Sequence, residues 1–142
     1  MPIQRRGTTP GTHEVNVPTP TVAAGTAADL PVWRNNLGVN VVITRVGFTP
    51  DSDVTGDDTN NFSLTVLNKE DDGTGTTAVA TKEYATGVDM SDFVEDELTL
   101  STTAADLVVA SGEVLALAKT EDNAGLELPE GLLRIEYEGA GV

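Results

Sequence analysis

Hydrophobic residues along this chain mostly alternate with polar ones, which is the pattern of β-strands that bury one face in a core. The longest run rich in β-branched residues, 38–50, departs from this rule. Its apolar residues take odd positions in the first half and even positions in the second: Val39, Val41 and Ile43, then Val42, Val46 and Phe48. Such a strand is either covered on both faces or bulged near Val41. The run therefore predicts a central strand between two packed sheets.

The same alternation, interrupted by turn residues, predicts the other strands. The clearest is 62–68, which pairs in a hairpin with 77–84 across a long polar loop. Further strands are expected at residues 29–34, 98–102, 107–110, 114–119 and 132–137. One helical turn is predicted inside 86–97, where capping residues precede Phe93 and Val94. About eight short strands without a long amphipathic helix predict an all-β, two-sheet sandwich of jelly-roll or Greek-key type.

The beginning of the chain differs from the rest in charge. Arg5, Arg6 and His13 lie in a stretch without acids, whereas all 23 acidic residues lie at Glu14 or beyond. Because residues 1–13 carry little apolar surface, we expect them to be extended or disordered until a partner binds them. They form either a frayed terminus or an anchor that becomes ordered on a partner.

We predict an extended N-terminal arm at residues 1–22 and one β-sandwich domain at residues 23–142. Within the arm, residues 14–22 alternate but contain two prolines, which restricts them to an edge strand or a polyproline connector. If the arm is an anchor, an isoleucine supplies its apolar contact and two arginines supply charge-assisted hydrogen bonds. The candidate contact residues are Ile3, Gln4, Arg5, Arg6 and His13.

Charge and composition exclude several classes of function. A net charge of -15 repels phosphate backbones and anionic lipids, so we expect no nucleic-acid partner and no membrane partner. The chain has no cysteine, which excludes disulfides, thiolate metal sites and a cysteine nucleophile. No apolar run approaches the roughly 20 residues of a membrane span, and the start does not resemble a signal peptide. We therefore expect synthesis in a cytoplasm.

Two features suggest a binding site. Trp33, followed by Arg34, could stack on a sugar, although a single tryptophan near a strand end is more often part of a core or a subunit interface. These two residues are the candidate subunit interface. The loop 51–61 carries four carboxylates but has Thr55 and Phe62 where an EF-hand needs an Asp or Asn and a bidentate Glu. A looser cation site in this loop stands as the alternative to a solvated surface loop.

Catalysis is not expected. The only imidazole is His13, in the arm, so neither a Ser-His-Asp arrangement nor a zinc site has a positioned ligand. Paired carboxylates are always available among 23 acids, yet glycosidase clefts also need several aromatic residues, and most of the few present here are at strand positions that a core would use. We predict a protein that is not an enzyme, with no cofactor and no catalytic or metal site.

Three segments of the chain carry a resemblance to a known family: residues 42–50, 110–117 and 129–137. Together with the basic arm and the acidic, Thr- and Val-rich body, they resemble the small jelly-roll head-decoration proteins of tailed bacteriophages. The resemblance implies a virion structural protein on the outer capsid surface. It also implies the major capsid protein as partner, assembly as a homotrimer and no catalytic residues.

The alternative is an adhesion module, either a tail-fibre domain or a carbohydrate-binding domain. Such a module would use Trp33 and a calcium ion held by the acidic loop.

Overall fold

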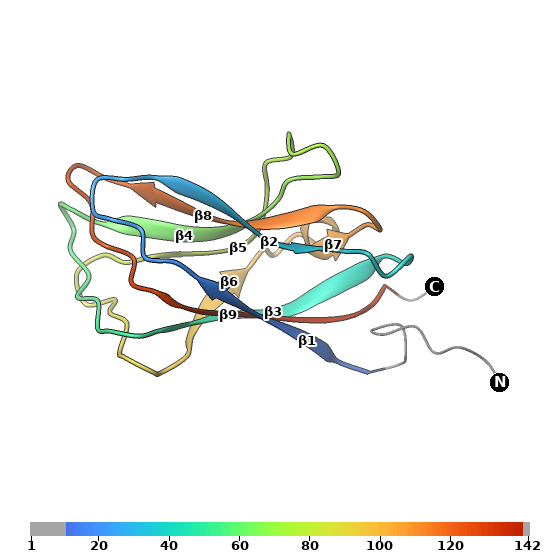
Figure 1. Cartoon of the computed structure of the whole chain (residues 1–142), viewed down its shortest axis with the longest axis horizontal. Coiled ribbons are helices and arrows are strands. Elements are labelled where there is room, and N and C mark those ends of the chain that lie inside the picture. Colours follow the sequence, from blue (N-terminus) through green and yellow to red (C-terminus); the bar gives the residue numbers. More distant parts are fainter. Residues whose placement is uncertain (1–10, 141–142) are drawn as a thin grey trace.

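A computed structural model describes residues 11–140, and its regular secondary structure is almost entirely β. Within this range it has nine strands and one short 3-10 helix (Figure 1). These are β1 (His13–Thr19), β2 (Ala28–Arg34), β3 (Val41–Pro50), β4 (Phe62–Asn68), β5 (Thr77–Glu83), β6 (Asp96–Leu100), η1 (Ala104–Leu107), β7 (Val108–Val109), β8 (Val114–Glu121) and β9 (Gly131–Gly139). The described residues contain no helix with the length and apolar character of a transmembrane span.

The strands pair as a long hairpin folded onto itself. Apart from the short β7, the antiparallel pairs are nested: β1 with β9, β2 with β8, β3 with β6 and β4 with β5. Additional pairing of β9 with β3 and of β8 with β4 produces the layers β1-β9-β3-β6 and β2-β8-β4-β5, which lie face to face in Figure 1. This nested order is that of a jelly roll. The prediction of an all-β, two-sheet sandwich is confirmed.

Strand β6 joins the two layers along one side. Its first part pairs with β3, at Val46↔Leu98, and its last part pairs with β5, at Ala80↔Leu100. On the other side, β1 and β2 are the two edge strands. Each contains a proline, Pro18 or Pro31, which an edge strand tolerates because one side of its backbone needs no ladder partner. The edge-strand interpretation of residues 14–22 is therefore confirmed for their strand portion.

The predicted irregularity of the central strand is a β-bulge. The pairing of β3 with β9 shifts register between Ile43 and Arg45. Because the extra residue reverses which face later side chains occupy, Val41 and Ile43 are buried before the shift, and Val46 and Phe48 are buried after it. The bulge lies two to four residues beyond the predicted position near Val41.

The core occupies the space between the two layers. The predicted alternation is present in β4 and β9: the inward residues are Phe62, Leu64 and Val66, and Leu133, Ile135 and Tyr137. Fully buried members include Phe48, Phe62, Leu64, Leu98, Leu117, Leu133 and Ile135.

The helical turn predicted inside 86–97 is wrong. Asp89, expected to cap it, instead accepts a hydrogen bond from the Gly56 N–H at 2.8 Å. Met90 forms an isolated β-bridge with Val54. These tertiary hydrogen bonds hold the segment as a loop, and the 3-10 helix of the described residues lies later, at η1.

A buried lysine fastens the β1–β2 connection to β8. The Lys119 side chain is 1% exposed, forms an ion pair with Glu121 and lies 5.6 Å from the centroid of the Phe62 ring. Its ammonium also donates to the backbone carbonyls of the 22–26 segment: Ala23 at 2.9 Å, Thr26 at 3.2 Å and Val22 at 3.5 Å. The Lys119 ammonium thus donates hydrogen bonds to the β1–β2 connection, which crosses from one layer to the other.

Candidate functional site

The predicted contact arm lies mostly outside the described residues. Ile3, Gln4, Arg5 and Arg6 belong to the segment 1–10, which the structure does not describe. His13 is the exception: predicted to belong to a mobile arm, it is instead the first residue of β1 and pairs with Tyr137 of β9. Its ring stacks on that of Tyr137, with centroids 5.5 Å apart. Residues 13–19 of the predicted arm are therefore an edge strand of the sandwich.

Trp33 belongs to the interior side of β2. A register shift between Pro31 and Trp33 turns the indole inward, where it stacks on Tyr137 at 5.1 Å and packs against the core. One indole face is thus occupied by a residue of its own chain. Arg34 is exposed and donates from Nη1 to the Gly112 carbonyl at 2.8 Å. Of the two candidate interface residues, Arg34 is the one with an exposed side chain.

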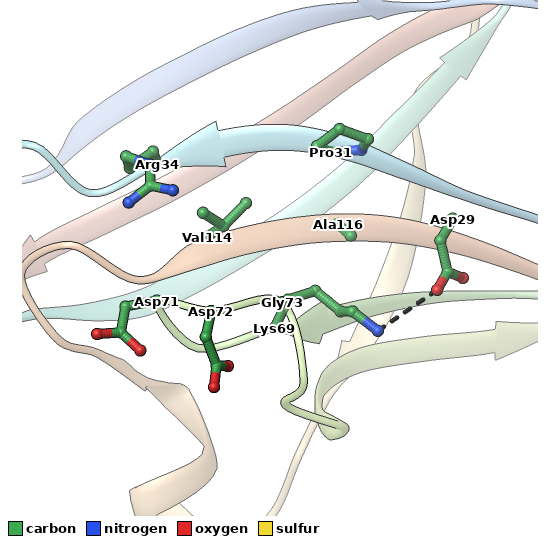
Figure 2. Close-up of a pocket in the computed structure, with 9 residues that line it drawn as sticks. All are labelled: Asp29, Pro31, Arg34, Lys69, Asp71, Asp72, Gly73, Val114 and Ala116. Atoms are coloured by element: carbon green, nitrogen blue, oxygen red, sulfur yellow. Dashed lines mark hydrogen bonds and ion pairs between the residues drawn. The ribbon is translucent and has the colours of Figure 1, made fainter.

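Arg34 borders an open depression on the outer side of the β2-β8-β4-β5 layer. Figure 2 shows Lys69, from the β4–β5 hairpin loop, reaching Asp29 of β2, and the ion pair measures 3.4 Å. The depression has a volume of about 360 Å³ and is lined by Asp29, Pro31, Arg34, Lys69, Asp71, Asp72, Gly73, Val114 and Ala116. Its rim carries both signs of charge around a small apolar floor, which suits a protein surface better than a small charged ligand.

The carboxylates of the acidic loop are used as hydrogen-bond acceptors. Asp57 accepts from the N–H groups of Asn60 and Thr59, and these bonds lower the pKa of Asp57 below its usual range. Asp53 accepts from the Asp92 N–H at 2.7 Å, and Asp58 from the Thr86 N–H at 2.9 Å. Within residues 11–140 no cluster of three or more potential ligands is placed to hold a metal ion. The loop is fastened to residues 86–92 by its own side chains.

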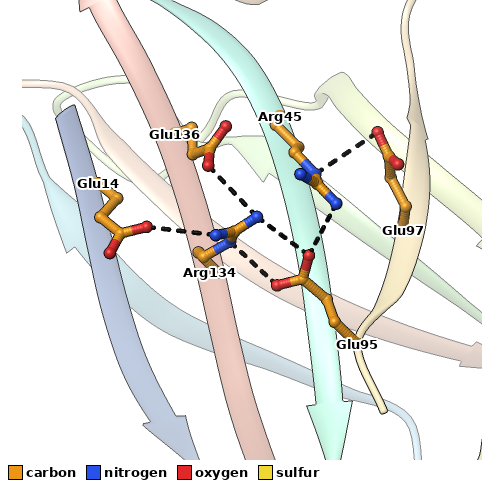
Figure 3. A network of polar contacts seen from close by, with 6 residues as sticks. All are labelled: Glu14, Arg45, Glu95, Glu97, Arg134 and Glu136. Carbon is orange, nitrogen blue, oxygen red and sulfur yellow. Dashed lines mark hydrogen bonds and ion pairs between the residues drawn. The ribbon is translucent and has the colours of Figure 1, made fainter. Parts of the chain in front are cut away.

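The outer face of the other layer carries a network of charges that crosses β1, β9, β3 and the start of β6 (Figure 3). Glu95 is at its centre, 2.9 Å from Arg134 Nε and 3.0 Å from Arg45 Nη2. Three further glutamates extend the network: Glu14, Glu97 and Glu136. Gly47 leaves the space that Glu95 occupies, because a Cβ there would lie 2.6 Å from the Glu95 Cδ. The network neutralises the two cations of this face.

An apolar tip lies at the end of the sandwich opposite His13. Phe93, Val94 and Leu132 are the exposed large hydrophobic residues of the described chain, with exposed fractions of 77%, 58% and 40%. We call these three residues the Phe93 tip. The depression beside it, of about 420 Å³, is lined by Thr49, Pro50, Asp51, Phe93, Glu130, Gly131 and Leu132. The sequence prediction missed this feature because it placed Phe93 and Val94 in a helical turn.

Comparison with known proteins adds little to this description. No protein-family model and no curated protein sequence matches the chain. Among solved structures, it is similar to two structures of infectious bursal disease virus. Comparison with the Gx-strain structure gives a TM-score of 0.31 and 10% sequence identity. Comparison with the Gt-strain structure gives 0.28 and 11%, and each comparison covers 95% of this chain. The chain spans 31% and 37% of those two viral chains. A likeness at this level says nothing of function.

Proposed function

We propose that this protein is a virion structural protein that decorates the outer surface of a tailed-bacteriophage head and has no catalytic role. Its partner is the lattice of the major capsid protein, and it acts there as a homotrimer. The resemblance of residues 42–50, 110–117 and 129–137 to decoration proteins supports this function. A sandwich with few open backbone edges and a dense core suits a part that must withstand mechanical load on a shell.

The observation that carries the proposal is the division of charge between the arm and the body. Residues 1–10 contain two arginines and none of the 23 acids, and the chain then continues directly into edge strand β1. An acidic body stays soluble at high local concentration and does not bind the genome. A basic segment anchored on a rigid edge strand supplies the attachment that the acidic body lacks. It attaches either to capsid subunits or across a neighbouring copy.

Arg34 and Trp33 remain the candidate subunit interface. Arg34 contributes its exposed guanidinium at the rim of the depression in Figure 2, and Trp33 supports β2 from beneath. The opposite layer carries the charge network of Figure 3, which is less suited to close packing against an identical acidic copy.

The test is co-sedimentation with capsid shells assembled from the cognate major capsid protein alone. The full chain is expected to sediment with the shells to saturation. A chain lacking residues 1–10 is expected to lose at least nine-tenths of this binding. The deletion stops before β1, because His13 stacks on Tyr137 and its loss would disturb the sandwich. A variant with Arg5→Lys and Arg6→Lys controls for charge and should still bind. Undiminished binding of the shortened chain, with an unchanged circular dichroism spectrum, would refute attachment through the arm.

A further inference from the structure

Phe93 is presented to solvent by its backbone. Its φ is 58°, in the left-handed region that bulky residues rarely adopt. Phe93 is also 77% exposed, so little side-chain packing within residues 11–140 offsets this strain. A strained backbone that displays an apolar side chain is typical of a binding element.

The loop that carries Phe93 is held at several points. The Phe93 N–H donates to the Pro50 carbonyl at 2.8 Å, and the Asp92 N–H donates to Asp53 at 2.7 Å. Earlier in the same loop, the backbones of Met90 and Val54 exchange two N–H to carbonyl hydrogen bonds, and both side chains are buried. The ring is therefore displayed in a fixed place, which lowers the entropic cost of binding a partner there.

The surroundings of the Phe93 tip select a basic partner. The charged residues among those that line the adjacent depression are Asp51 and Glu130, and both are exposed. Asp92, next to Phe93, is exposed as well. An apolar patch with an acidic rim suits an extended segment that carries one apolar residue and neighbouring cations.

We propose that the Phe93 tip is the receptor for the arm, residues 1–10, of a neighbouring copy of this chain. This inference rests on the proposed function and deepens it by naming the arm's docking site. The arm has the required chemistry, because it holds Ile3, Arg5 and Arg6 and no acid. Ile3 fills the depression beside the Phe93 ring, and the arginines pair with the acidic rim.

Position favours a neighbouring copy over the same chain. The arm precedes His13, which pairs with Tyr137, whereas the depression includes Gly131, which pairs with Thr19 at the far end of β1. An arm of ten residues spans at most roughly 33–36 Å. To bind its own tip it would have to reverse direction and retrace all of β1, about 23 Å at 3.3 Å per residue. A copy placed end to end meets the arm directly.

The test measures self-association of the full chain by analytical ultracentrifugation without capsid shells. The wild-type chain is expected to associate, and association should weaken when NaCl is raised from 0.05 to 0.5 M. Without shells two variants should each be monomeric, because the homotrimer proposed above forms on the capsid lattice. One is Phe93→Asn, which suits a positive φ and so removes the ring without unfolding the loop. The other combines Arg5→Glu with Arg6→Glu. Phe93→Leu and the double Arg→Lys variant are the matched controls and should still associate.

Mixing the two monomeric variants gives the decisive result. Phe93→Asn retains an intact arm, and the double Arg→Glu variant retains an intact Phe93 tip. The mixture should therefore form a one-to-one complex and nothing larger. A monomeric wild-type chain, or unchanged association of Phe93→Asn, would overturn the inference. Shell binding distinguishes this failure from failure of the proposed function. If the arm deletion abolishes shell binding while Phe93→Asn associates normally, the docking site is wrong and the decoration role stands.

Discussion

Substitution of Lys119 by methionine is expected to lower the free energy of unfolding by about 3–5 kcal/mol, the cost of removing one member of a buried ion pair. The side chains of Lys119 and Glu121 are 1% and 8% exposed. Methionine nearly preserves the volume but leaves the Glu121 carboxylate without its cation. It also removes the donor shared by the carbonyls of Val22, Ala23 and Thr26. Urea denaturation followed by tryptophan fluorescence measures the change.

Lys69→Met is the matched control for this substitution. Lys69 also forms an ion pair, with Asp29, but the Asp29 side chain is 56% exposed, so the expected loss is below about 1 kcal/mol. Adding Glu121→Leu to Lys119→Met should recover part of the stability, because the stranded carboxylate is then removed. Equal losses for Lys119→Met and Lys69→Met would contradict the role assigned to the buried lysine.

At high pH, ionisation of Tyr84 is expected to destabilise the folded protein. Its hydroxyl donates to Asp96 at 2.6 Å, and burial together with Asp96 raises the pKa of Tyr84 above its ordinary value of 10.0. The folded state therefore retains the phenolic proton after the unfolded chain has released it. The stabilisation is fully present below pH 10 and is lost as the pH rises further. The free energy of unfolding should fall by about 1.4 kcal/mol per pH unit above pH 10 from this group.

Tyr84→Phe isolates this effect. The variant loses the hydrogen bond to Asp96, which costs about 1–2 kcal/mol at neutral pH, but it has no phenolic proton to lose. Other groups that titrate in this range are common to both proteins, so the difference between their denaturation profiles from pH 9 to pH 12 reports Tyr84 alone. Parallel profiles would show that the pKa of Tyr84 is not raised in the folded state.

The strands could be predicted because burial on one face leaves a period of two in the sequence. This signal located β4 and β9 to within about two residues. The change of parity in β3 indicated either two covered faces or a bulge, and the structure has a register shift there. The burial of Lys119 was not predicted, although the same signal marks it. Lys119 follows Leu115 and Leu117 at a spacing of two, so its side chain lies on the same, core-facing side of the strand. A lysine at such a position indicates a buried cation.

The loops could not be predicted in the same way, because their conformation depends on tertiary hydrogen bonds. Asp89 has the sequence signature of a helix cap, but its carboxylate binds Gly56, which is 33 residues away. Phe93 is a residue type common in cores, but its backbone is bonded to the Pro50 carbonyl and its side chain is exposed. The candidate docking site thus lies where local sequence preference and the fold disagree, as is common for functional sites.

Electron cryomicroscopy of cognate capsid shells, with and without this protein, tests the decoration role most directly. We predict added density on the outer surface, grouped in threes, in which the jelly-roll body fits and the basic arm reaches a neighbouring subunit or copy. Shells that remain bare at saturating protein, or density confined to their interior, would contradict the decoration role.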